Sequence, residues 1–130
     1  MNVASRLEAL NERYGTQIII GAETRQAAGE AIVVRRLDQV AVYGRVQGIA
    51  IYELLGMANE MAPPAWVGAY EAGLDAFAER RWQAAVALFQ AADRECGGDL
   101  PSAILIERCR QYLAVPPPTD WSPVTLLDSK

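Results

Sequence analysis

The chain has 130 residues, of which 52% are hydrophobic and 22% charged, and these proportions are typical of one globular domain or two small ones. Its formal net charge is −4 and its longest basic clusters are Arg35-Arg36 and Arg80-Arg81, so the concentrated basic face of a nucleic-acid-binding protein is not expected. There is no histidine, which excludes imidazole general-base chemistry and histidine metal ligation within the chain.

The first predicted element is a helix over residues 1–14. Four apolar side chains at helical spacing define its core face: Val3, Leu7, Leu10 and Tyr14. Asn2 and Arg6 lie one turn apart on the neighbouring polar face, where an amide and a permanent cation reach the same small anionic group. Taken alone, this pair is also typical of a solvated helix face. Gly15 follows the last periodic residue and predicts the end of the helix.

Three short strands and one short helix are predicted next. Residues 17–20 predict a strand, and their three consecutive isoleucines favour a strand that is covered on both faces. Residues 22–28 predict a short surface helix that is closed by Gly29. Residues 31–38 and 48–54 predict two further strands, and the glycine-containing segment between them predicts a hairpin turn.

One pattern links four segments of the first 56 residues: Asn2–Leu10, Tyr14–Ile20, Thr24-Arg25 and Val33–Asp38. It resembles the C-terminal part of a class III adenylate/guanylate cyclase catalytic domain. The resemblance implies an α+β fold, namely a partial ferredoxin-like cyclase half-domain with a helix, three short strands and a short helix. In that family an asparagine of the helix orients the ribose of the nucleotide triphosphate, and an arginine one turn later stabilises charge that develops on the α-phosphate. These roles fall on Asn2 and Arg6.

The segment 41–48 resembles the Lys-Gly-Lys-containing hairpin of the same family, in which a lysine contacts the terminal phosphates of the nucleotide. The corresponding residues here are Tyr43-Gly44-Arg45. Tyr43 carries no charge, so two alternatives stay open. Either Arg45 contacts the phosphates, or the contact is missing and the segment is a plain hairpin turn.

Class III cyclases hold two divalent metals with two aspartates from the first half of the domain, and this chain does not contain that half. Phosphoryl transfer depends mainly on positioned metal and positive charge, so we expect the isolated chain to be inactive. We expect no cofactor in the chain itself, and Mg or Mn with ATP or GTP only for a complete cyclase. The remaining carboxylates show no spacing that would rebuild the metal site, and we expect solvated surface positions for Glu8, Glu12, Glu23 and Asp38.

A composition change at residues 57–64, which end in Pro63-Pro64, predicts a linker. After it, residues 65–114 predict a small α-helical unit: two helices over 65–95, broken near Arg80-Arg81, and a third over 101–114. The apolar side of the third helix is expected to contain Ile104, Leu105, Cys109, Tyr112 and Leu113.

The first two of these helices resemble a tetratricopeptide repeat (TPR). Gly73 and Ala85 match the small residues where paired helices cross closely, and Trp82 matches the aromatic start of the second helix. Phe89 and Ala92 match that helix too, whereas the first-helix Trp and Tyr of the family are replaced by Ala69 and Ala76. One repeat is fewer than the three or so of a solenoid, so a packing core of a small bundle is favoured over a peptide-binding groove.

Cys96 and Cys109 lie in the predicted helical unit. Buried free thiols are favoured over a disulfide between them, because no signal peptide or long apolar run precedes them and a cytoplasmic location is therefore expected. Residues 115–130 form a Pro-rich tail with Trp121. It is either disordered or docked on the preceding helices, and docking is favoured because a solvent-exposed tryptophan is costly.

Three functional interpretations follow. The chain is a C-terminal fragment of a nucleotide cyclase that acts in signal transduction, supplying Asn2 and Arg6 to a site completed by another chain. Alternatively, it is a TPR-like protein-protein interaction or dimerisation module without catalysis, or a truncation with no function of its own. The exposed apolar sheet expected of a half-domain predicts a homodimer or pairing with the missing cyclase half-domain. The helical unit offers a surface for a protein partner, and neither nucleic acid nor membrane is expected as a partner.

Overall fold

The residues that the computed structural model describes are 11, 14–16, 18–42 and 48–127. They form an α+β protein, as predicted, whose chain divides into two compact units. The sheet unit comprises residues 1–63 and 124–130, and the helical unit comprises residues 64–123. None of the helices within the described ranges is long and apolar enough to cross a membrane.

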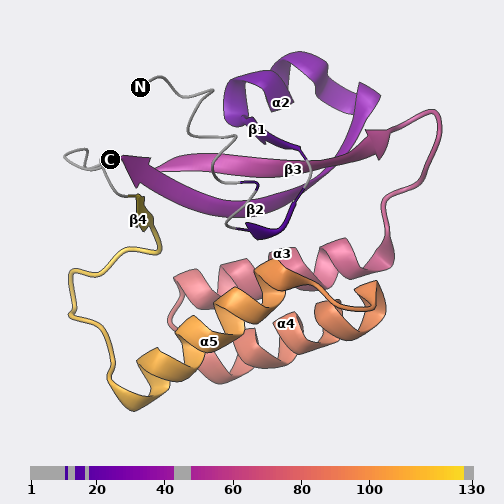
Figure 1. Cartoon of the computed structure of the whole chain (residues 1–130). Coiled ribbons are helices and arrows are strands. Elements are labelled where there is room, and N and C mark those ends of the chain that lie inside the picture. Colours follow the sequence, from indigo (N-terminus) through magenta and orange to yellow (C-terminus); the bar gives the residue numbers. More distant parts are fainter. Residues whose placement is uncertain (1–10, 12–13, 17, 43–47, 128–130) are drawn as a thin grey trace. The chain divides into compact units, whose positions relative to one another are not determined.

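The sheet unit contains a four-stranded sheet with the order β1-β3-β2-β4 (Figure 1). Its strands are β1 (Ile19–Gly21), β2 (Ile32–Val42), β3 (Ile49–Met57) and β4 (Thr125–Leu127). β1 and β2 each pair antiparallel with β3, and β4 pairs parallel with β2. Helix α2 (Ala22–Ala28) and the 3-10 turn η1 (Gly29–Ala31) connect β1 to β2, and α2 packs on β1 and β3.

α2 lies where the sequence predicts it, and the first three strands overlap their predicted ranges, although β2 continues to Val42, beyond the predicted end at residue 38. Gly29 closes α2 with a φ of 57°, a left-handed conformation that glycine adopts without strain. The expectation that all three isoleucines of residues 17–20 are covered is wrong, because Ile19 is buried but Ile18 is 48% exposed. The predicted linker begins later than expected, since β3 continues to Met57 and Met61 folds back onto Gly56.

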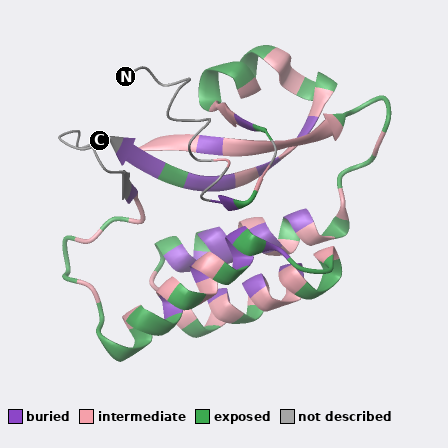
Figure 2. Ribbon diagram, viewed as in Figure 1, coloured by how far each residue is buried: buried purple, intermediate pink, exposed green. Residues whose placement is uncertain are grey.

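A β-bulge in the middle of β2 changes which side chains are buried. Arg36 is opposite Tyr52 and Asp38 is opposite Ile51, so Leu37 is the extra residue between them. Before the bulge, alternate residues of β2 are buried; after it, the alternation shifts by one position and Asp38 is buried as well (Figure 2).

The helical unit contains three helices, α3 (Ala65–Ala78), α4 (Trp82–Cys96) and α5 (Leu100–Ala114). α3 packs on α4, and α4 packs on α5. Their positions confirm the predicted helices, and Arg80, with a φ of 64°, forms the predicted break between α3 and α4. α3 and α4 approach closely at Gly73, where a Cβ atom would lie 2.7 Å from the Phe89 ring. The absence of a side chain at this position lets the two helices meet.

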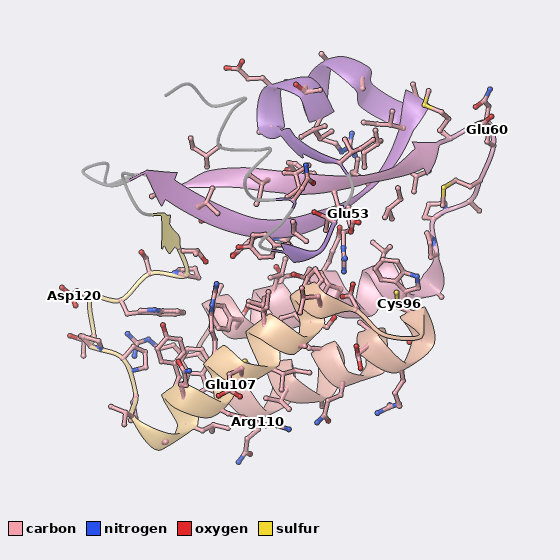
Figure 3. All side chains as sticks on the ribbon, viewed as in Figure 1. Glu53, Glu60, Cys96, Glu107, Arg110 and Asp120 are labelled. Carbon is pink, nitrogen blue, oxygen red and sulfur yellow. The ribbon has the colours of Figure 1, made fainter. Side chains whose placement is uncertain are left out.

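α5 begins at a capped N-terminus. Asp99 accepts hydrogen bonds from the Ser102 backbone N–H and hydroxyl at 3.2 and 2.6 Å, which satisfies an otherwise free donor of the first turn. The helix buries Leu105 and Cys109, as predicted, but Leu113 is 45% exposed and does not belong to the apolar side. On the solvent side of α5, Glu107 and Arg110 are exposed (Figure 3).

The tail after α5 has two parts within the described residues. Its first part belongs to the helical unit, where Trp121 packs on the helices, which confirms the predicted docking. Its second part forms β4, a strand that the sequence analysis did not predict. We call residues 115–123 the strap, because they connect α5 to β4.

Candidate functional site

The three residues predicted to contact a nucleotide, Asn2, Arg6 and Arg45, lie outside the described residues, as does Tyr43. Two residues near the predicted end of the first helix are described. Asn11 and Tyr14 are helical, and the Thr16 N–H donates to the Asn11 carbonyl at 3.0 Å. Gly15 has a φ of 67°, so the helix ends at Tyr14-Gly15 as predicted.

The carboxylate of Asp38 forms the centre of a buried polar network in the sheet unit. Its Oδ2 accepts hydrogen bonds from the Tyr14 hydroxyl and the Thr125 hydroxyl, each at 2.7 Å. Its Oδ1 accepts from the backbone N–H of Gln39 at 2.8 Å. Tyr14, Asp38 and Thr125 are all less than 10% exposed. The network therefore joins the end of the first helix, the centre of β2 and the start of β4.

The prediction that Asp38 is a solvated surface residue is wrong. Strict alternation from Val33 onward places it on the less buried face of β2, and the bulge at Leu37 moves it into the interior. No local signal in the sequence announces this bulge. Of the other carboxylates in that prediction, Glu23 is exposed as expected, and Glu8 and Glu12 lie outside the described residues.

A partly buried ion pair joins β2 and β3. Arg35 is 2% exposed, and its Nη2 lies 2.6 Å from Oε1 of Glu53, the residue directly opposite it in the sheet (Glu53 is labelled in Figure 3). The Arg35 Nε donates to the same oxygen at 2.8 Å. Arg35 is thus held inside the protein by a cross-strand partner, and it does not form a basic surface patch with Arg36.

In the described part of the chain, no three Cys, Asp or Glu side chains gather closely enough to hold a metal ion. A surface hollow of about 590 Å³ lies between α2, the start of β2 and residues 58–63, and its charged lining residues are Arg25 and Glu30. The Arg25 guanidinium already donates to the Gly29 carbonyl at 2.9 Å. The hollow contains no cluster of groups with an evident chemical role.

The strap is held on the helical unit by an aromatic cluster, which comprises Phe77, Trp82, Tyr112 and Trp121. The Trp121 ring centre lies 5.3 to 5.5 Å from the other three, with interplanar angles of 67° to 75°. Such edge-on geometry is favourable for aromatic pairs. The Trp121 Nε1–H donates to the Tyr112 hydroxyl at 3.2 Å, so its polar atom is also satisfied.

Arg80 holds the strap from the other side. Its guanidinium donates to the carbonyls of Pro117, at 3.2 Å, and of Pro118, and it lies over the Trp121 ring at 5.4 Å. This cation-π geometry adds to the aromatic contacts. The left-handed backbone conformation of Arg80 is therefore accompanied by contacts that only a long, planar cation makes.

Both cysteines are free thiols, as predicted. Cys109 is buried in α5, whereas Cys96, at the end of α4, is only half-buried. Burial raises the pKa of the Cys109 thiol from its ordinary value of 9.0 to about 11, although the nearby Arg108 charge opposes the shift. Cys109 is therefore an unreactive core residue.

The chain thus combines a small antiparallel sheet that has a buried carboxylate network with a three-helix unit. No protein-family model matches it, and no solved structure matches it. Among curated proteins it is similar to "Adenylate cyclase, terminal-differentiation specific" from Dictyostelium discoideum, with 32% identity over 122 residues. The alignment covers 87% of this chain and 6% of that protein, so the chain is similar to a short segment of an adenylate cyclase.

This similarity supports the cyclase resemblance and also extends it. The resemblance was assigned to residues 1–56, but an alignment over 87% of the chain is longer than the whole sheet unit. The aligned residues therefore include part of the helical unit.

Proposed function

We propose that the chain corresponds to the C-terminal part of a class III nucleotide cyclase catalytic domain followed by a helical unit, and that it acts in cytoplasmic signal transduction. The observation that carries this proposal is the 32% identity to an adenylate cyclase over 87% of the chain. The partial ferredoxin-like half-domain is consistent with three antiparallel strands and one short helix after the predicted first helix.

In the proposed reaction, a ribose hydroxyl attacks the α-phosphate of ATP or GTP and pyrophosphate leaves. Asn2 orients the ribose, Arg6 stabilises the charge that develops on the α-phosphate, and Arg45 contacts the terminal phosphates. An arginine suits the second role because its planar donor fork matches phosphate oxygens. Mg²⁺ or Mn²⁺ would neutralise the phosphates, held by aspartates of a complementary cyclase half-domain.

The proposal is tested by complementation. The purified chain is incubated with ATP or GTP and Mn²⁺, alone and together with a half-domain that carries the two metal-binding aspartates. We expect no cyclic nucleotide from the chain alone and cyclic product from the mixture. Arg6→Ala should reduce the rate by about 100-fold or more, as loss of a transition-state donor does.

Arg13→Ala is the matched control, because Arg13 lies on the same polar stripe of the predicted first helix. It should leave the rate nearly unchanged. Equal loss in the two variants, or a mixture that binds no nucleotide, would contradict the proposed role of this chain.

A second candidate function belongs to the helical unit. The close approach of α3 and α4 at Gly73 and the burial of Ala85, Phe89 and Ala92 favour a TPR-like helix pair. In this interpretation the unit binds another protein and the chain has no catalytic role. Capture of the same protein by the intact chain and by residues 64–123 alone would favour it.

We also propose that the chain forms a homodimer through its sheet unit. Ile18, opposite Leu54, and Met57, at the end of β3, are 48% and 44% exposed, and a partner would cover them. Light scattering at micromolar concentration is expected to give twice the 14.2 kDa mass of one chain. A constant mass of one chain at every concentration would contradict the homodimer.

A further inference from the structure

The Asp38 network connects parts of the sequence that lie far apart. Tyr14 comes from the end of the predicted helix that carries Asn2 and Arg6, whereas Thr125 comes from the C-terminal strand β4. Both hydroxyls donate to the same carboxylate oxygen, Oδ2 of Asp38. Hydrogen bonds to a charged acceptor are stronger than neutral ones, and their loss in a buried site leaves charge without full compensation.

The C-terminal segment also lies against Gly48, just before β3 and next to the predicted hairpin that contains Arg45. Gly48 is the first described residue after this hairpin, and a Cβ atom at Gly48 would lie 2.8 Å from Cγ2 of Val124. This close approach requires glycine at position 48. Thr125 is therefore linked to Tyr14 through Asp38, and Val124 lies against Gly48.

β4 is a short strand at the edge of the sheet. It is three residues long and pairs parallel with a single neighbour, at Val40, Ala41 and Val42 of β2. Parallel pairing is slightly weaker than antiparallel pairing, and a strand of this length supplies few backbone hydrogen bonds. The Thr125 hydroxyl bond to Asp38 therefore adds to the backbone pairing that holds β4 in place.

We infer that Asp38, Thr125 and Val124 are positioning residues: residues 124–127 hold the end of the predicted first helix through Asp38 and Tyr14, and they hold Gly48, next to the predicted hairpin of Arg45. One consequence of this inference rests on the proposed function: if the chain binds a nucleotide, β4 is required for an ordered nucleotide site. The network itself is independent of that function. Residues 124 and 125 would then determine how well residues 1–16 are held in position.

The test uses the full chain and measures amide hydrogen exchange by mass spectrometry, together with binding of ATP in the presence of Mn²⁺. Thr125→Val removes the hydroxyl while keeping the shape of the side chain. It should accelerate exchange in residues 1–16 and 41–48 by about tenfold or more, because the buried carboxylate loses a donor. Thr125→Ser should restore slow exchange, and Thr119→Val, at an exposed threonine of the strap, should have no effect.

The coupling must also act in the opposite direction. Tyr14→Phe removes the other hydroxyl and should accelerate exchange in residues 124–127, since coupling between two sites is reciprocal. This variant keeps the test valid if Thr125→Val does not fold. Peptides from α3, α4 and α5 serve as the internal reference for general destabilisation.

Faster exchange that is confined to residues 124–130 in Thr125→Val would overturn the inference, as would equal acceleration in every peptide. Coupled exchange with no ATP binding in the unmodified chain supports the positioning network and contradicts the proposed function. ATP binding that is unchanged in Thr125→Val, with unchanged exchange in residues 1–16, supports the proposed function and contradicts the inference.

Discussion

Two polar side chains of β2 with ionisable groups are buried, and each is compensated in a different way. Arg35 faces an opposite charge, Glu53, across the sheet. Asp38 accepts hydrogen bonds from two hydroxyls and one backbone N–H. Burial of a charge without such partners would be very unfavourable. The Glu53 pairing is local to one hairpin, whereas the Asp38 network requires residues from both ends of the chain.

At Gly73 a single methyl group should destabilise the helical unit. Alanine favours a helix over glycine by about 1 kcal/mol, but its Cβ would lie 2.7 Å from the buried Phe89 ring. Overpacking of this kind costs about 1–3 kcal/mol, so steric repulsion outweighs helix propensity. We expect Gly73→Ala to lower the free energy of unfolding in urea.

Gly68→Ala is the matched control, because it lies in the same helix and its Cβ would have nothing within 4 Å. This variant should keep the free energy of unfolding or raise it by up to about 1 kcal/mol. If both variants are stabilised, Phe89 moves aside easily and the close approach of α3 and α4 is not required.

Cys109 should make stability depend on pH in the alkaline range. Its pKa is raised from 9.0 to about 11 by burial, so the folded state retains the thiol proton while the unfolded state releases it. The contribution of Cys109 to the free energy of unfolding is fully present below pH 9 and is lost as the pH rises from about 9 to about 11. We expect the free energy of unfolding to fall by about 2–3 kcal/mol over this range.

The measurement is a series of urea denaturations of the unmodified chain and of Cys109→Ala. Other groups that titrate near pH 10 are common to both proteins, so the difference in their pH slopes isolates Cys109. Parallel slopes would show that this thiol does not titrate differently in the folded state. In the folded protein, iodoacetamide should modify Cys96 before Cys109.

At the scale of elements, the helices and the first three strands could be predicted because their signals are local. Pro63-Pro64 precedes α3, Gly97 ends α4 in a left-handed conformation, and Gly29 ends α2. β4 could not be predicted, because three residues after a Pro-rich segment have no periodicity. What makes them a strand is pairing with β2, which is distant in sequence.

The candidate site was predictable only in part for the same reason. Asn2, Arg6 and Arg45 follow from a local motif, and their roles stay predictions. The Asp38 network depends on a bulge and on long-range contacts, so no pattern along the chain reveals it. The docking of Trp121 was predictable, because a large aromatic side chain followed by apolar residues is unfavourable in water.

The strap should be a stabilising element of the helical unit. Trp121→Ala removes three ring contacts, the hydrogen bond to Tyr112 and the cation-π contact with Arg80. Because Trp121 is only partly buried, we expect a loss of about 2–3 kcal/mol, below that of a fully buried tryptophan.

Trp121→Phe separates these contributions, because it keeps a ring and loses the Nε1–H donor, and it should cost about 1 kcal/mol. Ser122→Ala changes an exposed neighbour and should cost less than about 0.5 kcal/mol. Urea denaturation followed by circular dichroism measures all three variants. Equal stability of Trp121→Ala and the unmodified chain would mean that the strap is not held by the aromatic cluster.

At the scale of the whole molecule, the two units differ in how local their contacts are. The sheet unit needs residues from both ends of the chain, since β4 pairs with β2. The helical unit is built from helices that are consecutive in sequence, each packed on the next, with a strap that follows directly. Local contacts cost less chain entropy to form, so the helical unit should fold independently.

Residues 64–123, expressed alone, should therefore unfold cooperatively with a helical circular dichroism spectrum. Small domains of about 60 residues are only marginally stable, so loss of the strap should have a large effect. A second fragment, residues 64–114, lacks Trp121 and the proline carbonyls that Arg80 binds. If the strap contributes about 2–3 kcal/mol, this fragment should melt at least about 10 °C lower. Identical melting of the two fragments, or a non-cooperative melt of residues 64–123, would show that the three helices depend on the sheet unit for their fold.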